Sequence, residues 1–294
     1  MQPLYLCADI GGTRIKTALL TADGQLAGPI FQQDARAALA REALLDHIAA
    51  CLLAPVQAAP GKRPCGVRLA MPGPCDYDAG ICKIEGLGKY AALYNVDLCA
   101  ALGRRLAPAL GAAAAGLRLQ NDVAAFALGE LHFGCARGTG RGLFVCIGTG
   151  CGSAFSLGDG LAPEGTPGMP AGGYLYPLPL RGLRVDDWLS RRGLQRLSRQ
   201  TLGEELDGLP LAQRARAGDA GALAVWQQFG ALLAEALTPA LDTYRPQLCC
   251  LGGQVTASGA LFLEPLHRAC RQRGVRLETT ADTSLRAMQG ALVT

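Results

Sequence analysis

Long apolar runs and charged residues are both scarce in this 294-residue chain, in which 50% of residues are hydrophobic and 18% are charged. The most apolar stretches, such as 106–117, fall well short of the ~20 apolar residues that a membrane-spanning helix needs. Residues 1–20 include Asp, Arg, Lys and Gly, so they lack the unbroken apolar segment of a signal peptide. The apolar content excludes a largely disordered chain. We therefore expect a cytoplasmic protein without a membrane span.

Patterns typical of metal sites and disulfide frameworks are also missing. The chain has 12 Cys, but no two of them form a C-x-x-C pair, and the three His are far apart in the sequence. Several cysteines lie inside apolar runs, where Cys behaves as a small hydrophobic residue. The spacings therefore argue against both a zinc cluster and a disulfide framework.

Positive charge is not concentrated anywhere in the chain. The net charge is +4, and the densest basic stretch, Arg181 to Arg199, is interrupted by Asp186, Asp187 and several Leu. This pattern is more typical of a solvated helix face than of a surface that binds nucleic acid. We expect no nucleic-acid partner.

The two halves of the chain have a related plan of predicted elements, each with a strand, a glycine-rich turn, a second strand and another turn. In the first half, the sequence pattern predicts strands at 4–10, 14–20, 25–32 and 65–71 and helices at 35–53 and 96–110. In the second half, it predicts strands at 117–120, 142–147, 153–157, 247–251 and 275–280, helices at 122–133, 185–200, 219–243, 260–273 and 284–293, and a long loop at 163–184. This repetition predicts an α/β protein of two similar domains, 1–116 and 117–283, with 284–294 completing the first. A binding cleft is expected between them.

Two glycine-rich turns occupy equivalent places in the two halves. The first is D-I-G-G-T at 9–13, with Lys16 close behind, and the second is G-T-G-C-G-S at 148–153. Glycines let backbone N–H groups approach an anion without a Cβ in the way. Asp9 ends the first strand and is suited to orient a hydrated Mg²⁺. One such turn is also compatible with an ordinary hairpin, but two matching turns favour a polyphosphate site.

Two further motifs each allow two interpretations. L-G-G-Q at 251–254 either lets a flat purine ring lie against the backbone or forms a plain strand-to-helix turn. Asn121-Asp122 stands where a helix begins, and Asp and Asn are common N-caps. The functional alternative makes Asp122 a general base.

In combination, the segments DIGGT, PGP, NDVAAFALGE, GTGCGS and LGGQ resemble the ROK family of bacterial sugar kinases and repressors. The resemblance covers essentially the whole chain. It implies an α/β fold of two ribonuclease-H-like (actin-like ATPase) domains flanking an interdomain cleft. It also implies ATP- and Mg²⁺-dependent phosphorylation of a sugar hydroxyl, the 6-hydroxyl of a hexose, by a homodimer. ATP and polyphosphate remain alternative donors, and the sugar is not identified.

The same resemblance assigns roles to particular residues. Asp122 is the catalytic base, and its neighbour Asn121 and the PGP-loop residue Gly73 contact the sugar. The nucleotide contacts are Asp9 (through Mg²⁺), Gly11, Gly12, Thr13, Lys16, Gly148, Thr149, Gly150, Gly152, Gly252, Gly253 and Gln254.

One region departs from the family pattern. Kinases of the family carry E-x-G-H, followed by a cluster with three zinc-binding Cys and a final Glu. Here Gly173 stands in place of the first Glu, Tyr176 in place of the His, and the zinc Cys are missing. We therefore predict no structural zinc. Asp186 replaces the final Glu as a sugar contact, or else it caps a helix that begins near 187. Glu164, on the loop, is a second candidate for the sugar.

A non-catalytic sugar-binding or regulatory member of the same family is the alternative to a kinase. Repressors of the family carry an N-terminal helix-turn-helix, and this chain begins within three residues of its first predicted strand. That feature, together with the retained Asp9, Asp122 and both glycine turns, favours the kinase.

Overall fold

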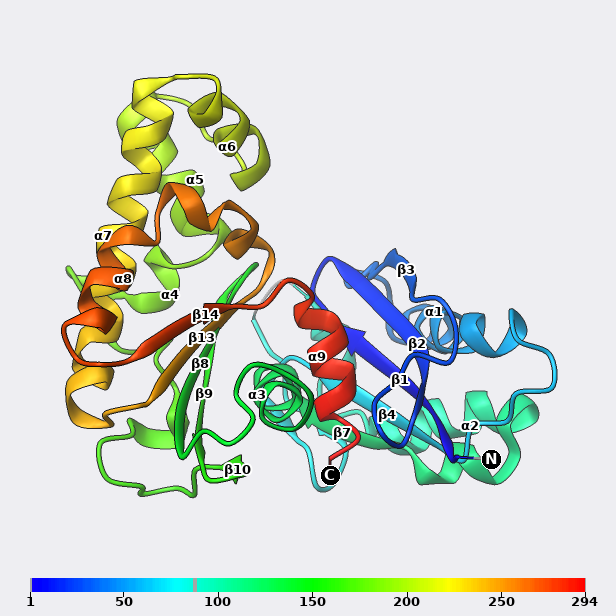
Figure 1. The fold of residues 1–294 in the computed structure, drawn as a ribbon. Coiled ribbons are helices and arrows are strands. Elements are labelled where there is room, and N and C mark those ends of the chain that lie inside the picture. The colour runs from blue at the N-terminus through cyan, green and yellow to red at the C-terminus, as the bar shows by residue number, and fades with distance from the viewer. Residues whose placement is uncertain (1, 87–88, 294) are drawn as a thin grey trace. The chain divides into compact units, whose positions relative to one another are not determined.

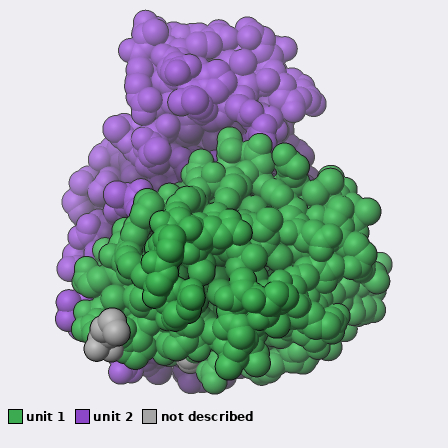
Figure 2. All heavy atoms as spheres, turned by 90° about the vertical axis from the view of Figure 1, so that its right-hand side faces the viewer, with its two compact units in different colours: residues 1–134, 284–294 green, residues 135–283 purple. Residues whose placement is uncertain are grey.

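The computed structural model describes residues 2–86 and 89–293, which form two five-stranded sheets with helices packed on them (Figure 1). The chain divides into two compact units (Figure 2). The first consists of residues 1–134 with 284–294, and the second of residues 135–283.

The first unit is built on a sheet of order β3-β2-β1-β4-β7. Strand β1 pairs antiparallel with β2 and parallel with β4, and β4 pairs parallel with β7. The strands are β1 (Leu4–Ile10), β2 (Arg14–Thr21), β3 (Phe31–Asp34), β4 (Gly66–Met71) and β7 (Arg118–Asn121), and a small ribbon joins β5 (Cys75–Asp76) to β6 (Ile81–Cys82). The helices are α1 (Arg41–Gln57), α2 (Leu98–Leu110), α3 (Asp122–Phe133) and α9 (Thr283–Gly290).

The core of the first unit follows from the alternation of side chains along β1. Leu6, Ala8 and Ile10 point to one face and pack with buried leucines of α1 and α2. Cys7 points to the opposite face and packs with Met288 of α9. Because successive strand residues face opposite sides, a run that is apolar throughout is covered on both faces.

The second unit repeats this arrangement with the order β10-β9-β8-β13-β14, again antiparallel for the first three strands and parallel for the rest. The prediction of two similar α/β halves is therefore confirmed. The strands are β8 (Arg141–Ile147), β9 (Cys151–Leu157), β10 (Gly160–Leu161), β13 (Leu248–Gly252) and β14 (Arg276–Thr279), with a separate ribbon of β11 (Pro179–Leu180) and β12 (Leu183–Arg184).

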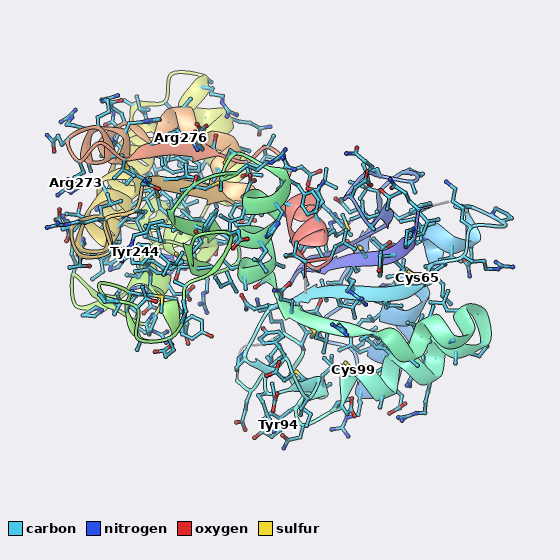
Figure 3. All side chains as sticks on the ribbon, turned by 60° about the horizontal axis from the view of Figure 1, so that its bottom comes forward. Cys65, Tyr94, Cys99, Tyr244, Arg273 and Arg276 are labelled. Carbon is cyan, nitrogen blue, oxygen red and sulfur yellow. The ribbon has the colours of Figure 1, made fainter. Side chains whose placement is uncertain are left out.

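Helices on the second sheet enclose its largest apolar core. They are α4 (Val185–Trp188), α5 (Arg191–Leu202), α6 (Gly208–Arg216), α7 (Ala220–Thr243) and α8 (Glu264–Arg271), with a 3₁₀ helix, η4 (Gln254–Leu261), before α8. Trp226 of α7 stacks on Phe262 with ring centroids 5.4 Å apart. Tyr244, labelled in Figure 3, lies just after α7 and is buried. It packs edge-on against Phe155, with Arg141 over its ring.

Two boundaries in the first unit differ from the sequence prediction. The third strand lies at Phe31–Asp34, not 25–32, because Pro29 has no N–H to donate to a ladder. The first helix begins at Arg41, not 35, since Ala35 bonds instead to the Thr13 carbonyl. It then continues through Pro55, and the Thr17 hydroxyl donates to the Cys51 carbonyl that the missing Pro55 N–H would have served.

Three elements of the second unit also differ from prediction. The helix expected at 185–200 is two helices, separated where Ser190 caps α5 by accepting from the Gly193 N–H. Helix α6 was not predicted, and Pro210 lies in its first turn. A proline in the first turn of a helix is tolerated, however, because the first N–H groups of a helix have no intrahelical partner. The helix expected at 260–273 is shorter, Glu264–Arg271, and η4 precedes it.

The compact units also divide the chain at a different place from the predicted domains. Strand β7 and helix α3 fall in the first unit, which extends to Gly134, whereas the predicted boundary lies at 116. The reason is that β7 is the fifth strand of the first sheet. Within the described residues, no helix combines the length and apolar character needed to cross a bilayer.

Candidate active site

The first glycine turn joins β1 to β2 and is held from both sides. Ile10 pairs with Ile15 across the hairpin, and the Gly11 N–H donates to the Arg14 carbonyl at 2.9 Å. Asp9 lies directly opposite Lys16 in the ladder. The glycine turn predicted to bind an anion therefore has a carboxylate, Asp9, and an ammonium, Lys16, on the two strands that lead into and out of it.

A second segment of the first unit supports this turn. The buried Tyr90 hydroxyl donates to the Gly11 carbonyl at 2.7 Å from 79 residues away in the chain. Tyr90 has a φ of 57°, which is uncommon for a non-glycine residue and costs of order 1 kcal/mol or more. Burial raises the pKa of Tyr90, and the charge of Asp9 adds to the shift. The phenol is thus a hydrogen-bond donor at neutral pH, and it fixes the shape of the turn.

Lys89, next to Tyr90, lies against the turn itself. A Cβ placed on Gly12 would lie 2.9 Å from Lys89 Cδ and 3.3 Å from Lys89 Nζ. Sequence reasoning missed both Lys89 and Tyr90, because no spacing pattern marks residues that reach a turn only through tertiary folding.

Asn121 and Asp122 have separate positions at the start of α3. Asn121 is the N-cap, and its Oδ1 accepts from the N–H groups of Val123 and Ala124 at 3.1 and 3.0 Å. Asp122 is the first residue of the helix. The capping interpretation therefore holds for Asn121 and is wrong for Asp122.

The environment of Asp122 suits a group that exchanges a proton. Burial raises its pKa above the ordinary carboxyl value, while the charge of Lys89 and the Val123 N–H act in the opposite direction. A base is most effective when its pKa lies near the working pH, so a raised carboxyl pKa is favourable.

Gly73 of the PGP segment lies beside Asn121. Strand register places Met71 opposite Asn121. The Asn121 amide donates to the Tyr77 hydroxyl at 3.1 Å, and that hydroxyl donates to the Met71 carbonyl at 3.1 Å. A Cβ on Gly73 would lie 2.9 Å from the same hydroxyl. Because β1, β4 and β7 are parallel neighbours, the first turn, Gly73 and Asp122 gather at one edge of the first sheet.

The second glycine turn joins β8 to β9, and α4 and α5 hold it. Asp186 Oδ1 accepts from the Cys151 N–H at 2.7 Å, and its Oδ2 accepts from Arg192 at 2.8 Å. The Arg191 N–H donates to the Gly148 carbonyl at 2.8 Å. The N-cap interpretation of Asp186 is wrong, because α4 begins at Val185, and Asp187 is the residue that accepts from the Arg184 N–H, at 3.1 Å.

The third glycine motif lies beside the second turn. A Cβ on Gly253 would lie 2.2 Å from the Ile147 carbonyl oxygen, and the residue has a φ of 95°. Only glycine fits there. The Gly253 N–H donates to Thr283 Oγ1 at 2.8 Å. Gly252 ends β13 and Gln254 is exposed at the start of η4, so the residue pair predicted to receive a purine is at the carboxyl edge of the second sheet.

The stretch 163–184, predicted as a loop, contains the β11–β12 ribbon and is tied to β9 by hydrogen bonds. Ser153 Oγ donates to the Gly173 carbonyl at 2.7 Å and accepts from the Leu175 N–H at 2.9 Å. The Tyr176 side chain is exposed, and its carbonyl accepts from the Asp186 N–H at 3.1 Å. Both Glu164 oxygens accept from the Gly172 N–H at 3.1 Å. Sugar contact by Glu164 or Asp186 stays a prediction, and both carboxylates already accept hydrogen bonds.

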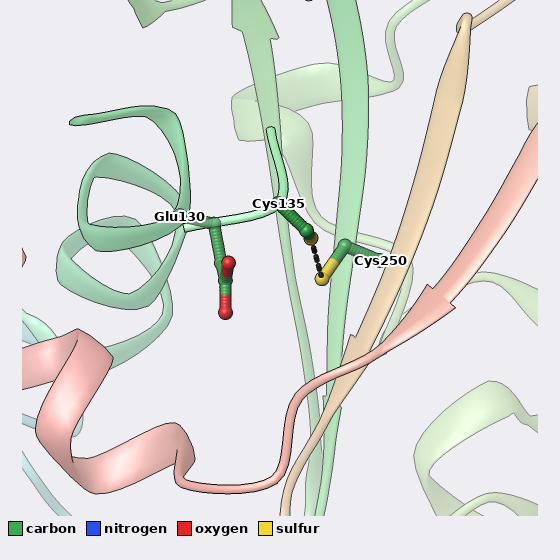
Figure 4. Close-up of side chains that lie close together, drawn as sticks. All are labelled: Glu130, Cys135 and Cys250. Carbon is green, nitrogen blue, oxygen red and sulfur yellow. Dashed lines mark hydrogen bonds between the residues drawn. The ribbon is translucent and has the colours of Figure 1, made fainter. Parts of the chain in front are cut away.

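The sequence pattern leads to a specific expectation for zinc. The stretch 163–184 contains no Cys, whereas Cys135 and Cys250 lie with their sulfur atoms 3.6 Å apart elsewhere in the second unit (Figure 4). A structural zinc site needs four ligands. We expect the purified protein to contain no stoichiometric zinc and to keep its melting temperature in a chelator. About one zinc per chain in metal analysis would contradict this.

Comparisons with known proteins agree with this arrangement. The sequence model of the ROK family matches residues 5–290. The chain belongs to the ROK family. The glucokinase of Thermotoga maritima is 25% identical over 280 residues, which are 88% of this chain and 84% of that protein.

Two solved ROK structures share the fold over nearly the whole chain, which confirms the predicted fold class. A Streptomyces griseus ROK family glucokinase, in complex with glucose and AMPPNP, has a TM-score of 0.80 at 19% identity and covers 99% of this chain and 98% of its own. A ROK family transcriptional regulator, a homologue of the E. coli MLC protein, has a TM-score of 0.78 at 17% identity. The match covers 100% of this chain and 78% of the regulator.

Proposed function

We propose that this ROK family protein transfers the γ-phosphoryl group of ATP to a hydroxyl of a hexose or hexose derivative, with the 6-hydroxyl as acceptor. The observation that carries the proposal is Asp122, a carboxylate of raised pKa at the same sheet edge as the first glycine turn. The named activity of the Thermotoga maritima relative supports the same reaction class.

The chemistry follows from what these residues offer. Asp122 accepts the proton of the sugar hydroxyl while the hydroxyl oxygen attacks the γ-phosphorus of ATP, and ADP leaves. Asn121 and Gly73, linked through Tyr77, border the acceptor sugar. The backbone N–H groups of Gly12 and Thr13 offset charge on the phosphate oxygens, whereas the Gly11 N–H donates to the Arg14 carbonyl within the hairpin. Positioning and charge stabilisation, not covalent chemistry, are what this reaction needs from the protein.

We propose further nucleotide contacts for Mg²⁺ and for the glycine motifs of the second unit. The Asp9 carboxylate and the Thr13 hydroxyl supply oxygen ligands beside the turn, and oxygen is the ligand atom that Mg²⁺ prefers. Water would complete the coordination shell of the ion. When bound, Mg²⁺ neutralises charge on the donor phosphates. We assign Lys16 and the turn at Gly148 to Gly152 to the phosphates as well, with Gly252, Gly253 and Gln254 against the adenosine.

A non-catalytic sugar-binding role is the second candidate, and the likeness to a transcriptional regulator favours considering it. It predicts a protein that binds a sugar but does not turn over ATP. The two candidates therefore differ in one measurable quantity, the rate at which ADP forms.

A panel of hexoses and N-acetylhexosamines, assayed with ATP and Mg²⁺ for ADP formation, tests the proposal. We expect turnover with at least one sugar and a phosphate on its 6-oxygen, read from the ³¹P–¹H coupling of the product. A parallel series with polyphosphate compares the two donors. A sugar that binds by calorimetry without any turnover would favour the non-catalytic role.

A further inference from the structure

Lys89 carries a positive charge near both the first glycine turn and Asp122, the two parts of the proposed reaction centre that lie in the first unit. Its side chain lies over the backbone of Gly12, with Nζ 3.3 Å from where a Cβ would stand. The same ammonium acts on Asp122, whose pKa it lowers against the effect of burial. One positive charge thus reaches both the phosphate turn and the proposed base.

The Lys89 ammonium makes no hydrogen bond within the described residues. Within residues 2–86 and 89–293, no hydrogen bond or ion pair involves it, and the side chain is partly buried. Two of the other three lysines are bonded: Lys83 donates to Asn95 at 2.8 Å and Lys62 donates to the Ala27 carbonyl. A partly buried ammonium that makes no hydrogen bond is available to an anionic ligand, and such a ligand offsets the cost of its desolvation.

The backbone next to Lys89 is anchored at several points. Tyr90 is buried, its hydroxyl donates to the Gly11 carbonyl, and its N–H donates to the Ala37 carbonyl at 2.8 Å. It holds a left-handed conformation to do so. These contacts set the position of Lys89 relative to the turn, which is what a residue that binds a reacting group requires.

We propose that Lys89 is a catalytic residue that contacts the phosphoryl group in transfer, between the turn at Gly12 and the sugar oxygen at Asp122. This rests on the proposed kinase function. A cation that the protein holds in a fixed position offsets charge on the phosphoryl oxygens during transfer, because it does not have to reorganise as the charge moves. A purely structural role, in which the methylene chain only covers Gly12, is the alternative.

Nucleotide binding tests the contact without knowledge of the sugar. Lys89→Met keeps the side-chain length over Gly12 and removes the charge. We expect its affinity for AMPPNP to fall roughly 10- to 100-fold, while its affinity for ADP, which lacks the transferable group, changes little. Lys89→Arg should retain most of the preference for AMPPNP, and Lys83→Met is the matched control with parental affinities for both.

Kinetics on the best sugar of the panel give a second readout. We expect Lys89→Met to lower kcat about 100- to 1,000-fold. The acidic limb of its pH profile should move to higher pH, because the pKa of Asp122 rises when the opposing positive charge is lost. Lys89→Arg should return the limb to its parental position. A covering role alone would leave the AMPPNP-to-ADP ratio unchanged, and that ratio therefore decides between the two roles.

The outcomes separate the inference from the proposed function. A parent protein that binds no nucleotide and phosphorylates no sugar would overturn both. A parent that binds AMPPNP more tightly than ADP, with a folded Lys89→Met variant that keeps the same ratio, would overturn only the role of Lys89. Circular dichroism shows which variants are folded.

Discussion

Replacing Asp122 with Asn is expected to lower kcat by roughly 100- to 10,000-fold, the usual cost of losing a general base. An amide is neutral at pH 7 and does not accept the proton of the sugar hydroxyl. It still forms hydrogen bonds to a sugar, so the KM for the sugar should change only modestly. Steady-state kinetics at saturating ATP measure both quantities.

Stability should be almost unaffected by the same substitution. Asn121, not Asp122, caps α3, and Asn at the first helical position keeps an oxygen that accepts from Val123, as Asp122 does at 2.9 Å. The substitution loses a favourable charge near the helix N-terminus, worth about 0.3–1 kcal/mol. It also removes the desolvation cost of a partly buried carboxylate, which acts in the opposite direction. We expect a shift in melting temperature of no more than about 4 °C.

Asp97→Asn is the matched control, because it removes one carboxylate from the first unit without touching the site. Asp97 caps α2 by accepting from the Ala100 N–H at 2.8 Å, and Asn caps about as well. Its kcat should equal that of the parent. Near-parental turnover in Asp122→Asn would assign the base to another carboxylate, with Asp186 and Glu164 the first to test.

Gly12→Val is expected to lower nucleotide affinity at least 10- to 100-fold, roughly the range expected when hydrogen bonds to a charged group are lost. The branched side chain would stand where phosphate oxygens approach the backbone. The fold should survive, because the nearest atoms to a Cβ at Gly12 belong to the flexible Lys89 side chain and Gly12 has no positive φ. Calorimetry with ATP and Mg²⁺ measures the affinity.

Gly28→Val is the matched control for this loss. Gly28 lies in the same unit, has no positive φ, and would have no atom within 4 Å of an added Cβ, so its variant should bind ATP as the parent does. Gly150→Val should also weaken binding, but its Cβ would meet Asp186 Oδ1 at 2.9 Å and disturb the Cys151 contact as well. Parental ATP affinity in a folded Gly12→Val variant would remove the first turn from the nucleotide site.

Local sequence determined the elements and motifs that a few neighbouring residues specify. The strand periodicity and the glycine turns predicted two matching sheets, because alternation and turn chemistry act over a few residues. The start of α3 at Asn121-Asp122 was predicted for the same reason. Sequence did not place the boundary of α1, because Ala35 bonds to Thr13 only once the sheet has formed.

Tertiary structure decided which residues surround those motifs. Tyr90 and Lys89 reach the first turn from 79 and 77 residues beyond Gly11 and Gly12, and Asp186 reaches Cys151 from 35 residues beyond it. Their roles depend on side-chain contacts that no local pattern encodes. Helix α1 continues through Pro55 for the same reason. The Thr17 hydroxyl, distant in the sequence, donates to the Cys51 carbonyl, which Pro55 has no N–H to serve. Sequence alone therefore specified the turns and the candidate base, and the folded chain supplied the groups that hold them and the cation beside them.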